Sequence, residues 1–425
     1  MGSTVPPRRY LRIVFRDNPV RRSISRIGIS SRKCQRRITL NKAMSITPMS
    51  PDQAVRGRVR TWVTSEWKLC ASRVNSQRKS TIRPPMRIAT IIVNYRTPEL
   101  VLRCLEALNS ERALLPDLEV FVVDNASSDG SPAVLSAAIQ RPPLSKWVTF
   151  LSLPLNGGFG WGNNQAILHV LQNNAPPDAF YLLNPDTVIE HGALHALVAC
   201  LRRHANAGAA GSQLLNTDRT LAGSAFRFPT IAREFIRGLG VGLVGRILGI
   251  KPVLCPYGVE GPVDWVTGAS VLIRTEALKD AGLFDTGFFL YFEEVELMYR
   301  MAQHGWRAYH CPLSRVVHVA GASTGIVDGK TDGDRVPPDY VFHSRRRFFS
   351  LTGGKRLALL ANLAWLVGDA LSLIVSLFAR SRRSAVSGER RALLRTGLRA
   401  RQEDTLSAIE QLHDKPGRVP SWMNQ

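Results

Sequence analysis

Short runs of apolar residues recur through the middle of the chain, and each is followed by a polar turn. Four such runs lie at residues 88–93, 118–123, 148–153 and 179–183. Between them, apolar positions repeat at the three- and four-residue spacing of one helix face. Strands that alternate with helices in this way predict an α/β fold, with an open, mostly parallel central sheet and helices on both faces.

Polar residues stand where these predicted strands end. Tyr95 and Asp124 follow the first and second runs, and Asp186 follows the fourth in the sequence Asn184-Pro185-Asp186. In open parallel sheets ligands bind beyond the carboxyl ends of the strands, so these side chains are expected to gather at one edge. A carboxylate there suits Mg²⁺ or Mn²⁺ holding a diphosphate. Asn-Pro-Asp after a strand is equally the composition of an ordinary turn.

Several short motifs follow one another in a fixed order along the chain. They are Asn94-Tyr95, Val123 to Ser131, Asn156-Gly157-Gly158-Phe159, Asn163-Asn164, Asn184-Pro185-Asp186-Thr187, Trp265 to Ala269, Phe292-Glu293-Glu294-Val295-Glu296 and His318. This order resembles that of family 2 glycosyltransferases with the GT-A fold, and most closely the rhamnosyltransferase-like branch of bacterial surface polysaccharide synthesis. The resemblance extends over about residues 86–325.

The resemblance implies a binding site for a nucleoside diphosphate sugar. Asp124 would accept a hydrogen bond from the imide N–H of uracil or thymine, with Tyr95 either beside the same base or merely packed there. The glycine-rich turn would let the backbone approach the ligand. The full set of implied donor-binding residues is Asn94, Tyr95, Asp124, Gly158, Asn163, Asn164, Asn184 and Asp186.

The resemblance also implies a metal site for Mg²⁺ or Mn²⁺. Asp186 matches the last acid of the family's Asp-x-Asp element, whereas Asn184 stands where that element has its first acid. His318 matches a metal-ligand position of the family. With one carboxylate missing, the metal would depend on Asp186, His318, water and the diphosphate oxygens. Considered by itself, a single histidine is more often a packing or surface residue.

Glu294 matches the family's catalytic base, which would take the proton of the acceptor hydroxyl. Many relatives have aspartate there. Glu293 would bind an acceptor hydroxyl or hold the loop, and the same acidic run is also typical of a helix N-terminus. Gly268 would leave room for the sugars in a strand expected over residues 263–273, and Trp265 would either stack on a sugar or belong to the core.

Glu296 and Arg300, four residues apart on the predicted helix, are expected to form a structural ion pair. Residues 223–229 and the apolar stretch 239–250 are expected to form an excursion on the acceptor side of the domain.

The charge of this 425-residue chain, +23 in total, is unevenly distributed. Residues 1–85 hold 20 Lys and Arg against 3 Asp and Glu, and residues 344–425 hold 15 against 6, so residues 86–343 carry 21 against 24. A catalytic domain without basic bias is not typical of a nucleic-acid enzyme, and no nucleic-acid partner is expected. The first segment is predicted to be a disordered basic extension or the product of a mis-assigned start.

The third segment, 344–425, is predicted to be a helical, membrane-associating tail. Residues 357–379 are mostly apolar and long enough to span a membrane. Asn362, Asp369, Ser376 and Arg383 recur every seven residues, however, which favours a helix lying in the interface of an anionic membrane with its apolar side down. A helix packed on the domain is the alternative. The expected location is the cytoplasm, at the inner face of the cell membrane.

The six cysteines, at positions 34, 70, 104, 200, 255 and 311, include no Cys-x-x-Cys pair. Their dispersion predicts reduced thiols, with neither a zinc site nor a disulfide framework.

The predicted activity is inverting, metal-dependent transfer of a sugar to a hydroxyl of a lipid-linked saccharide or polysaccharide precursor. By resemblance the donor is deoxythymidine diphosphate (dTDP) rhamnose, and a uridine diphosphate (UDP) hexose remains an alternative. A non-catalytic subunit that binds nucleotide sugars or carbohydrate is the alternative from another functional class.

Overall fold

The computed structural model describes residues 85–173, 175–319, 326–327, 330–331, 337–378, 388–397 and 402–424. The chain divides into two compact units, and every described residue belongs to the second, Pro84–Gln425. The predictions for the basic extension 1–85 fall almost entirely outside the described residues.

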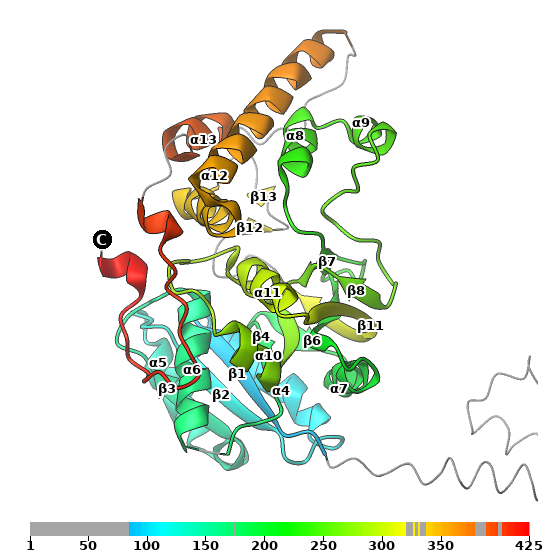
Figure 1. Ribbon diagram of the computed structural model, residues 1–425. Helices are drawn as coiled ribbons and strands as arrows, with labels where there is room; N and C mark the ends of the chain where they lie inside the picture. The colour runs from blue at the N-terminus through cyan, green and yellow to red at the C-terminus, as the bar shows by residue number, and fades with distance from the viewer. Residues whose placement is uncertain are drawn as a thin grey trace, which may run out of the picture. The chain divides into compact units, whose positions relative to one another are not determined.

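A nine-stranded sheet forms the centre of this unit, in the order β3-β2-β1-β4-β10-β6-β11-β5, with β8 paired to β11 (Figure 1). Neighbours β1, β2, β3 and β4 are parallel, β10 is antiparallel to both β4 and β6, and β6 is parallel to β11. Most strands therefore run in one direction, which confirms the predicted fold class. The strands are β1 (Ile88–Asn94), β2 (Glu119–Asp124), β3 (Val148–Ser152), β4 (Ala179–Leu183), β5 (Thr187–Ile189), β6 (Ala207–Leu215), β8 (Gly261–Val263), β10 (Ser270–Arg274) and β11 (Arg307–His318).

Each face of the sheet has its own apolar core. Successive residues of β1 point to opposite faces, so that Ile88 and Ile92 belong to one core whereas Ala89 and Ile91 belong to the other. The first core is covered by α4 (Pro98–Glu111), α5 (Ser131–Ile139) and α7 (Ala193–Arg203). The second is covered by α6 (Phe159–Asn173), α10 (Thr275–Ala281) and α11 (Glu293–Gln303). Burial on both faces explains the continuous apolar runs of the sequence.

The single strand predicted over residues 263–273 is wrong, because the chain leaves the sheet at its middle. Trp265–Val266 forms β9, which pairs with β7 (Ala225–Phe226) in a separate two-stranded sheet, and the Thr267 amide donates to the Ser224 carbonyl at 3.2 Å. The chain rejoins the central sheet at β10. The expected excursion contains β7, α8 (Ile231–Leu239) and α9 (Gly242–Ile247).

The C-terminal segment packs on this domain. Its elements are α12 (Asp339–Phe378), which kinks at Gly353 and Gly354, and α13 (Glu389–Gly397). Short elements elsewhere are η1 (Leu144–Lys146), β12 (Ile326–Val327), β13 (Lys330–Thr331), η2 (Gln402–Thr405) and η3 (Ser421–Asn424).

The polar stripe predicted on residues 357–379 faces the protein. Asn362 and Asp369 are buried, and they contact Arg345 and Arg390 respectively. The Ser376 side chain and Arg383 lie outside the described residues. α12 also lies against α8, where Gly368 approaches the backbone of Phe235. Polar residues of this helix are therefore used for packing, as the alternative of a domain-packed helix expects.

Three consecutive arginines at the start of the predicted basic tail are buried and paired. Arg345 contacts Glu234 at 2.7 Å, Arg346 contacts Asp404 at 2.7 Å, and Arg347 contacts Asp285 at 2.8 Å. Their charges therefore stabilise contacts within the unit, because a buried cation needs an adjacent anion.

Cys200 of α7 forms a disulfide with Cys311 of β11. The prediction that all six cysteines are reduced is therefore wrong for this pair. The two residues are 111 positions apart and meet because α7 packs against the sheet beside β11, an arrangement that cysteine spacing does not reveal. Cys104 and Cys255 are free, and Cys34 and Cys70 lie outside the described residues.

Candidate active site

The sheet brings the predicted donor-binding residues of β1 and β2 into contact. Asn94 lies opposite Asp124 in the parallel register, and its side-chain amide donates to Asp124 Oδ1 at 2.7 Å. Asp124 Oδ2 accepts from the Ser127 amide at 2.9 Å, while Asn94 Oδ1 accepts from Thr97. Asp124 is fully buried, so its orientation is fixed by the protein. Tyr95 is half-buried, with the Arg96 guanidinium 5.0 Å from its ring centre.

The glycine-rich turn before α6 is held against the loop that precedes α11. Gly158 has a φ of +89°, and a Cβ built on it would lie 1.9 Å from the Phe289 carbonyl oxygen. The Phe159 amide donates to that same oxygen at 3.2 Å. Glycine is thus required at 158 both by the backbone conformation and by the close approach of another segment.

The asparagines of α6 make hydrogen bonds within the protein. The Asn163 amide donates to the Phe159 carbonyl at 2.9 Å. Asn164 accepts from the Phe284 amide at 3.0 Å and donates to the Phe284 carbonyl at 2.8 Å and to Glu410 Oε2 at 2.6 Å. Asn164 is buried, so these bonds attach the loop before α11 and the C-terminal segment to α6.

Asp186 and His318 lie close together near β5 and β11, at the other end of the strand order from β1 and β2. His318 Nε2 lies 3.2 Å from Asp186 Oδ1, and the Val319 amide donates to the Asp186 carbonyl at 2.9 Å. The register that pairs His318 of β11 with Thr187 of β5 sets this approach. A carboxylate oxygen and an imidazole nitrogen side by side fit a divalent cation as two of its ligands, and leave its remaining positions to other oxygens.

The candidate base lies at the first turn of α11. Tyr291 and Phe292, with φ of 66° and 70°, turn the chain sharply into the helix. Glu293 is buried, and burial and then the neighbouring Glu294 raise its pKa well above the ordinary value. Burial likewise raises the pKa of Glu294. Among the residues that the structure describes, neither Glu293 Oε2 nor Glu294 Oε2 has a hydrogen-bond partner.

A short series of contacts connects the candidate base to the candidate metal ligands. A Cβ at Gly268 would lie 4.0 Å from the Cβ of Glu294 and 3.1 Å from the Phe159 ring, so a larger side chain would crowd this space. The next residue, Ala269, accepts a hydrogen bond from the Asn184 amide at 2.9 Å. Asn184 directly precedes the turn that carries Asp186. These contacts connect Glu294, through Gly268 and Ala269, to Asn184, two residues before Asp186.

Trp265 packs within the β7–β9 hairpin. Its ring stacks on Phe226, with ring centres 4.3 Å apart and planes inclined by 18°, and its Nε1 donates to the Arg227 carbonyl at 3.2 Å. One face of the ring is thus occupied by protein, which favours the core role left open for this residue. Glu296 and Arg300 form the predicted pair at 2.7 Å, which is confirmed.

The structure adds a C-terminal contribution that sequence analysis missed. Trp161 Nε1 donates to the Arg418 carbonyl at 2.7 Å, and Trp422 Nε1 donates to the Gly157 carbonyl at 3.4 Å. Trp422 also packs edge to face on Phe289. Residues 418–422 thereby lie against the glycine-rich turn and the start of α6. In the sequence, the one signal of this contact is Trp422 in a polar segment, and a single tryptophan does not indicate which residues it will contact.

The sequence of this domain matches a known protein family. Residues 84–330 match the family described as glycosyltransferase like family 2. The chain is 30% identical to the N-acetylglucosaminyl-diphospho-decaprenol L-rhamnosyltransferase of Mycobacterium tuberculosis over 276 residues, which are 62% of this chain and 84% of that protein. It is 27% identical to rhamnosyltransferase WbbL of Escherichia coli over 199 residues, covering 45% and 72% of the two chains.

Among solved structures, a mannosyltransferase of Pyrobaculum calidifontis in complex with GDP-Man and Mn²⁺ matches with a TM-score of 0.43 and 19% identity, over 73% of this chain and 79% of that one. The family match spans more than half of the chain and contains every predicted site residue, from Asn94 to His318. This protein is a glycosyltransferase, and it belongs to glycosyltransferase family 2.

Proposed function

We propose that this enzyme transfers L-rhamnose from dTDP-rhamnose to a hydroxyl of a lipid-linked saccharide, with inversion at the anomeric carbon and with a bound divalent cation. The observation that carries the proposal is the Asp186–His318 pair, together with the contacts that run from Asn184 through Ala269 and Gly268 to Glu294. The similar enzyme of M. tuberculosis is named as a rhamnosyltransferase for a decaprenol-linked sugar, and that name supports the choice of rhamnose and of a lipid-linked acceptor.

In the proposed reaction the acceptor oxygen attacks the anomeric carbon while the bond to the diphosphate breaks. Glu294 takes the hydroxyl proton at Oε2, the atom without a hydrogen-bond partner among the described residues. Its raised pKa makes the ionised carboxylate a stronger base. Asp186 and His318 would hold the cation, which would neutralise charge on the departing diphosphate. Asp124 would orient the thymine base from its fixed position, and Glu293 would bind an acceptor hydroxyl.

The test measures release of dTDP from dTDP-rhamnose with Mn²⁺ or Mg²⁺ and a lipid-linked N-acetylglucosamine diphosphate acceptor. UDP-glucose and UDP-N-acetylglucosamine serve as competing donors. Glu294→Gln is expected to lower the rate by about 10²–10⁴-fold, the usual contribution of a general base. Asp186→Asn should also weaken metal-dependent donor binding. Glu106→Gln, at an exposed position of α4, is the matched control. Near-normal turnover in Glu294→Gln would remove this residue from its role.

We further propose that the enzyme acts at the inner face of the cell membrane. The side of α12 opposite the buried Asn362 and Asp369 exposes a row of apolar side chains at helical spacing, namely Leu360, Leu363, Val367, Leu371 and Ile374. By length and composition α12 contains a stretch that could cross a membrane. The exposed Leu243, Ile247 and Leu248 lie in and just after α9, which follows α8, the helix packed on α12.

A helix whose polar residues face the protein and whose apolar residues face outward matches a lipid surface better than water. The exposed Lys355 and Arg356, just after the kink of α12, would contact anionic headgroups. Co-sedimentation with phosphatidylglycerol vesicles tests the proposal, with Leu363→Glu/Val367→Glu expected to remain in the supernatant. Val134→Glu, at an exposed apolar position of α5, is the control. Wild-type protein that stays in the supernatant would contradict it.

A further inference from the structure

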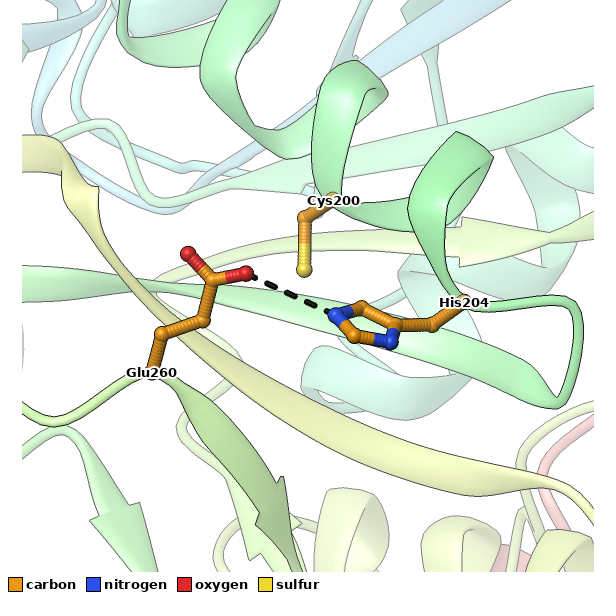
Figure 2. A group of neighbouring side chains, drawn as sticks. All are labelled: Cys200, His204 and Glu260. Carbon is orange, nitrogen blue, oxygen red and sulfur yellow. Dashed lines mark hydrogen bonds and ion pairs between the residues drawn. The ribbon is translucent and has the colours of Figure 1, made fainter. Parts of the chain in front are cut away.

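A second group of metal-binding side chains lies at the C-terminal end of α7. Cys200 and His204 are four residues apart and share one side of the end of this helix, as Figure 2 shows. Glu260 directly precedes β8, whose antiparallel register with β11 ends at the pair Gly261–His310, so Glu260 and Cys311 each stand one residue beyond that pair. The ligand atoms of Cys200, His204 and Glu260 all lie within 4.8 Å of one another. The disulfide adds the sulfur of Cys311 to this group.

The four donors are of the type that zinc prefers. Two thiolate sulfurs, one imidazole nitrogen and one carboxylate oxygen can complete a tetrahedral structural site. Thiolate ligands select zinc over the Mg²⁺ or Mn²⁺ expected at an Asp–His pair. Cys200 and Cys311 are buried, His204 is half-buried and Glu260 is exposed, so the two sulfur donors are shielded while solvent reaches the other two donors.

The surroundings hold the nitrogen and oxygen donors in place. The His204 ring stacks on Tyr309, with ring centres 4.2 Å apart and planes inclined by 16°, and its Nε2 lies 3.5 Å from Glu260 Oε1. Arg203 donates to the same oxygen at 2.7 Å. Partners of this kind orient the ligands of a metal. Two thiolates and a carboxylate carry one negative charge more than Zn²⁺ neutralises, and the Arg203 guanidinium offsets it.

We propose that Cys200, His204, Glu260 and Cys311 bind Zn²⁺ when the disulfide is reduced. A dithiol reductant would give two electrons and two protons to the disulfide and leave as its own disulfide, and Zn²⁺ would then displace the two thiol protons into solvent. In a reducing compartment, where disulfides rarely persist, the metal would replace the covalent connection between α7 and β11. The proposal is independent of the sugar donor and of the catalytic cation.

The test uses the full chain, reduced with a phosphine because dithiols compete for zinc, then freed of metal and titrated with Co²⁺. Binding at this site should produce the thiolate-to-cobalt charge-transfer absorption, which Asp186 and His318 by themselves cannot produce because neither side chain carries sulfur. Zn²⁺ should abolish the absorption at about one equivalent per chain. Unreduced protein should give no such absorption.

Substitutions of the proposed ligands test which side chains bind the metal. Cys311→Ser should lose the charge-transfer absorption or weaken it strongly, and His204→Gln and Glu260→Gln should each weaken zinc binding by at least about tenfold, since even outer-shell partners commonly contribute 10–100-fold. His204 and Glu260 are not fully buried, so these two variants should fold, as circular dichroism would verify. Cys255→Ser is the matched control. Reduced wild-type protein without cobalt–thiolate absorption, or unchanged zinc affinity in both His204→Gln and Glu260→Gln, would overturn the proposal.

Discussion

Glu410 offers the sharpest test of how the C-terminal segment is attached to the catalytic domain. Its side chain is 1% exposed and reaches Asn164 of α6, and its own backbone carbonyl accepts from the Leu283 amide at 2.8 Å. Burial raises its pKa to about 7, despite the hydrogen bond from Asn164. The substitution Glu410→Gln keeps the size and an oxygen for Asn164 but removes the titration.

The magnitude follows from the difference between the two pKa values. The pKa of Glu410 is about 7 in the folded protein, compared with an ordinary value of 4.5. Each pH unit corresponds to about 1.4 kcal/mol, so the ionised form of Glu410 destabilises the fold by about 3 kcal/mol. The folded state binds more protons than the unfolded state between these values, so stability falls as pH rises from 4.5 through 7. About 2.5 kcal/mol of this change develops between pH 5 and pH 8.

The assay is urea unfolding of wild type and Glu410→Gln at pH 5 and pH 8. The glutamine amide hydrogens introduce a penalty of about 1–3 kcal/mol if they stay without a partner, but this penalty is the same at both pH values and cancels in the comparison. We therefore expect the variant to gain about 2.5 kcal/mol relative to wild type between pH 5 and pH 8. Glu106→Gln should follow wild type at both. If wild type and Glu410→Gln differ by the same amount at pH 5 and pH 8, the reasoning from burial is refuted.

Three further predictions address the active site and its support. Because Glu294 must be ionised to accept a proton and burial raises its pKa, the acidic limb of the pH–rate profile should lie above pH 4.5, and a limb at or below that value would argue against this base. Gly158→Ala should lower the melting temperature, since alanine would be strained at a φ of +89° and would collide with Phe289; an unchanged melting temperature would contradict this. Arg347→Met should destabilise the fold by about 3–5 kcal/mol in urea unfolding by leaving buried Asp285 without its cation, whereas a loss below about 1 kcal/mol would indicate an alternative partner.

Features governed by local periodicity could be predicted from sequence. The four apolar runs became β1 to β4 within a residue or two, because strands buried on both faces need continuous apolar residues. The Glu296–Arg300 pair followed from helical spacing alone. Motif order identified the family, and the parallel sheet explains why Asn94 and Asp124, thirty residues apart, end side by side.

Tertiary structure alone decided which distant residues meet. Asn362 and Asp369 formed a polar stripe in the sequence, but only the packing of α12 directed it toward Arg345 and Arg390 rather than toward water. The chain also leaves the central sheet between β8 and β10, although the apolar pattern of residues 263–273 resembles one continuous strand.

Cys200 and Cys311, 111 residues apart, show the same limit most clearly. Metal-binding and disulfide motifs can be identified from sequence spacing when their residues lie on one short segment. Here a helix, a strand and the residue before a second strand each contribute, so the group exists only once α7 has packed on the sheet. Periodicity determined the elements of this protein, because secondary structure follows contacts between near neighbours. Packing determined its disulfide and its other long-range contacts, because side chains far apart in the chain meet only when the helices pack on the sheet.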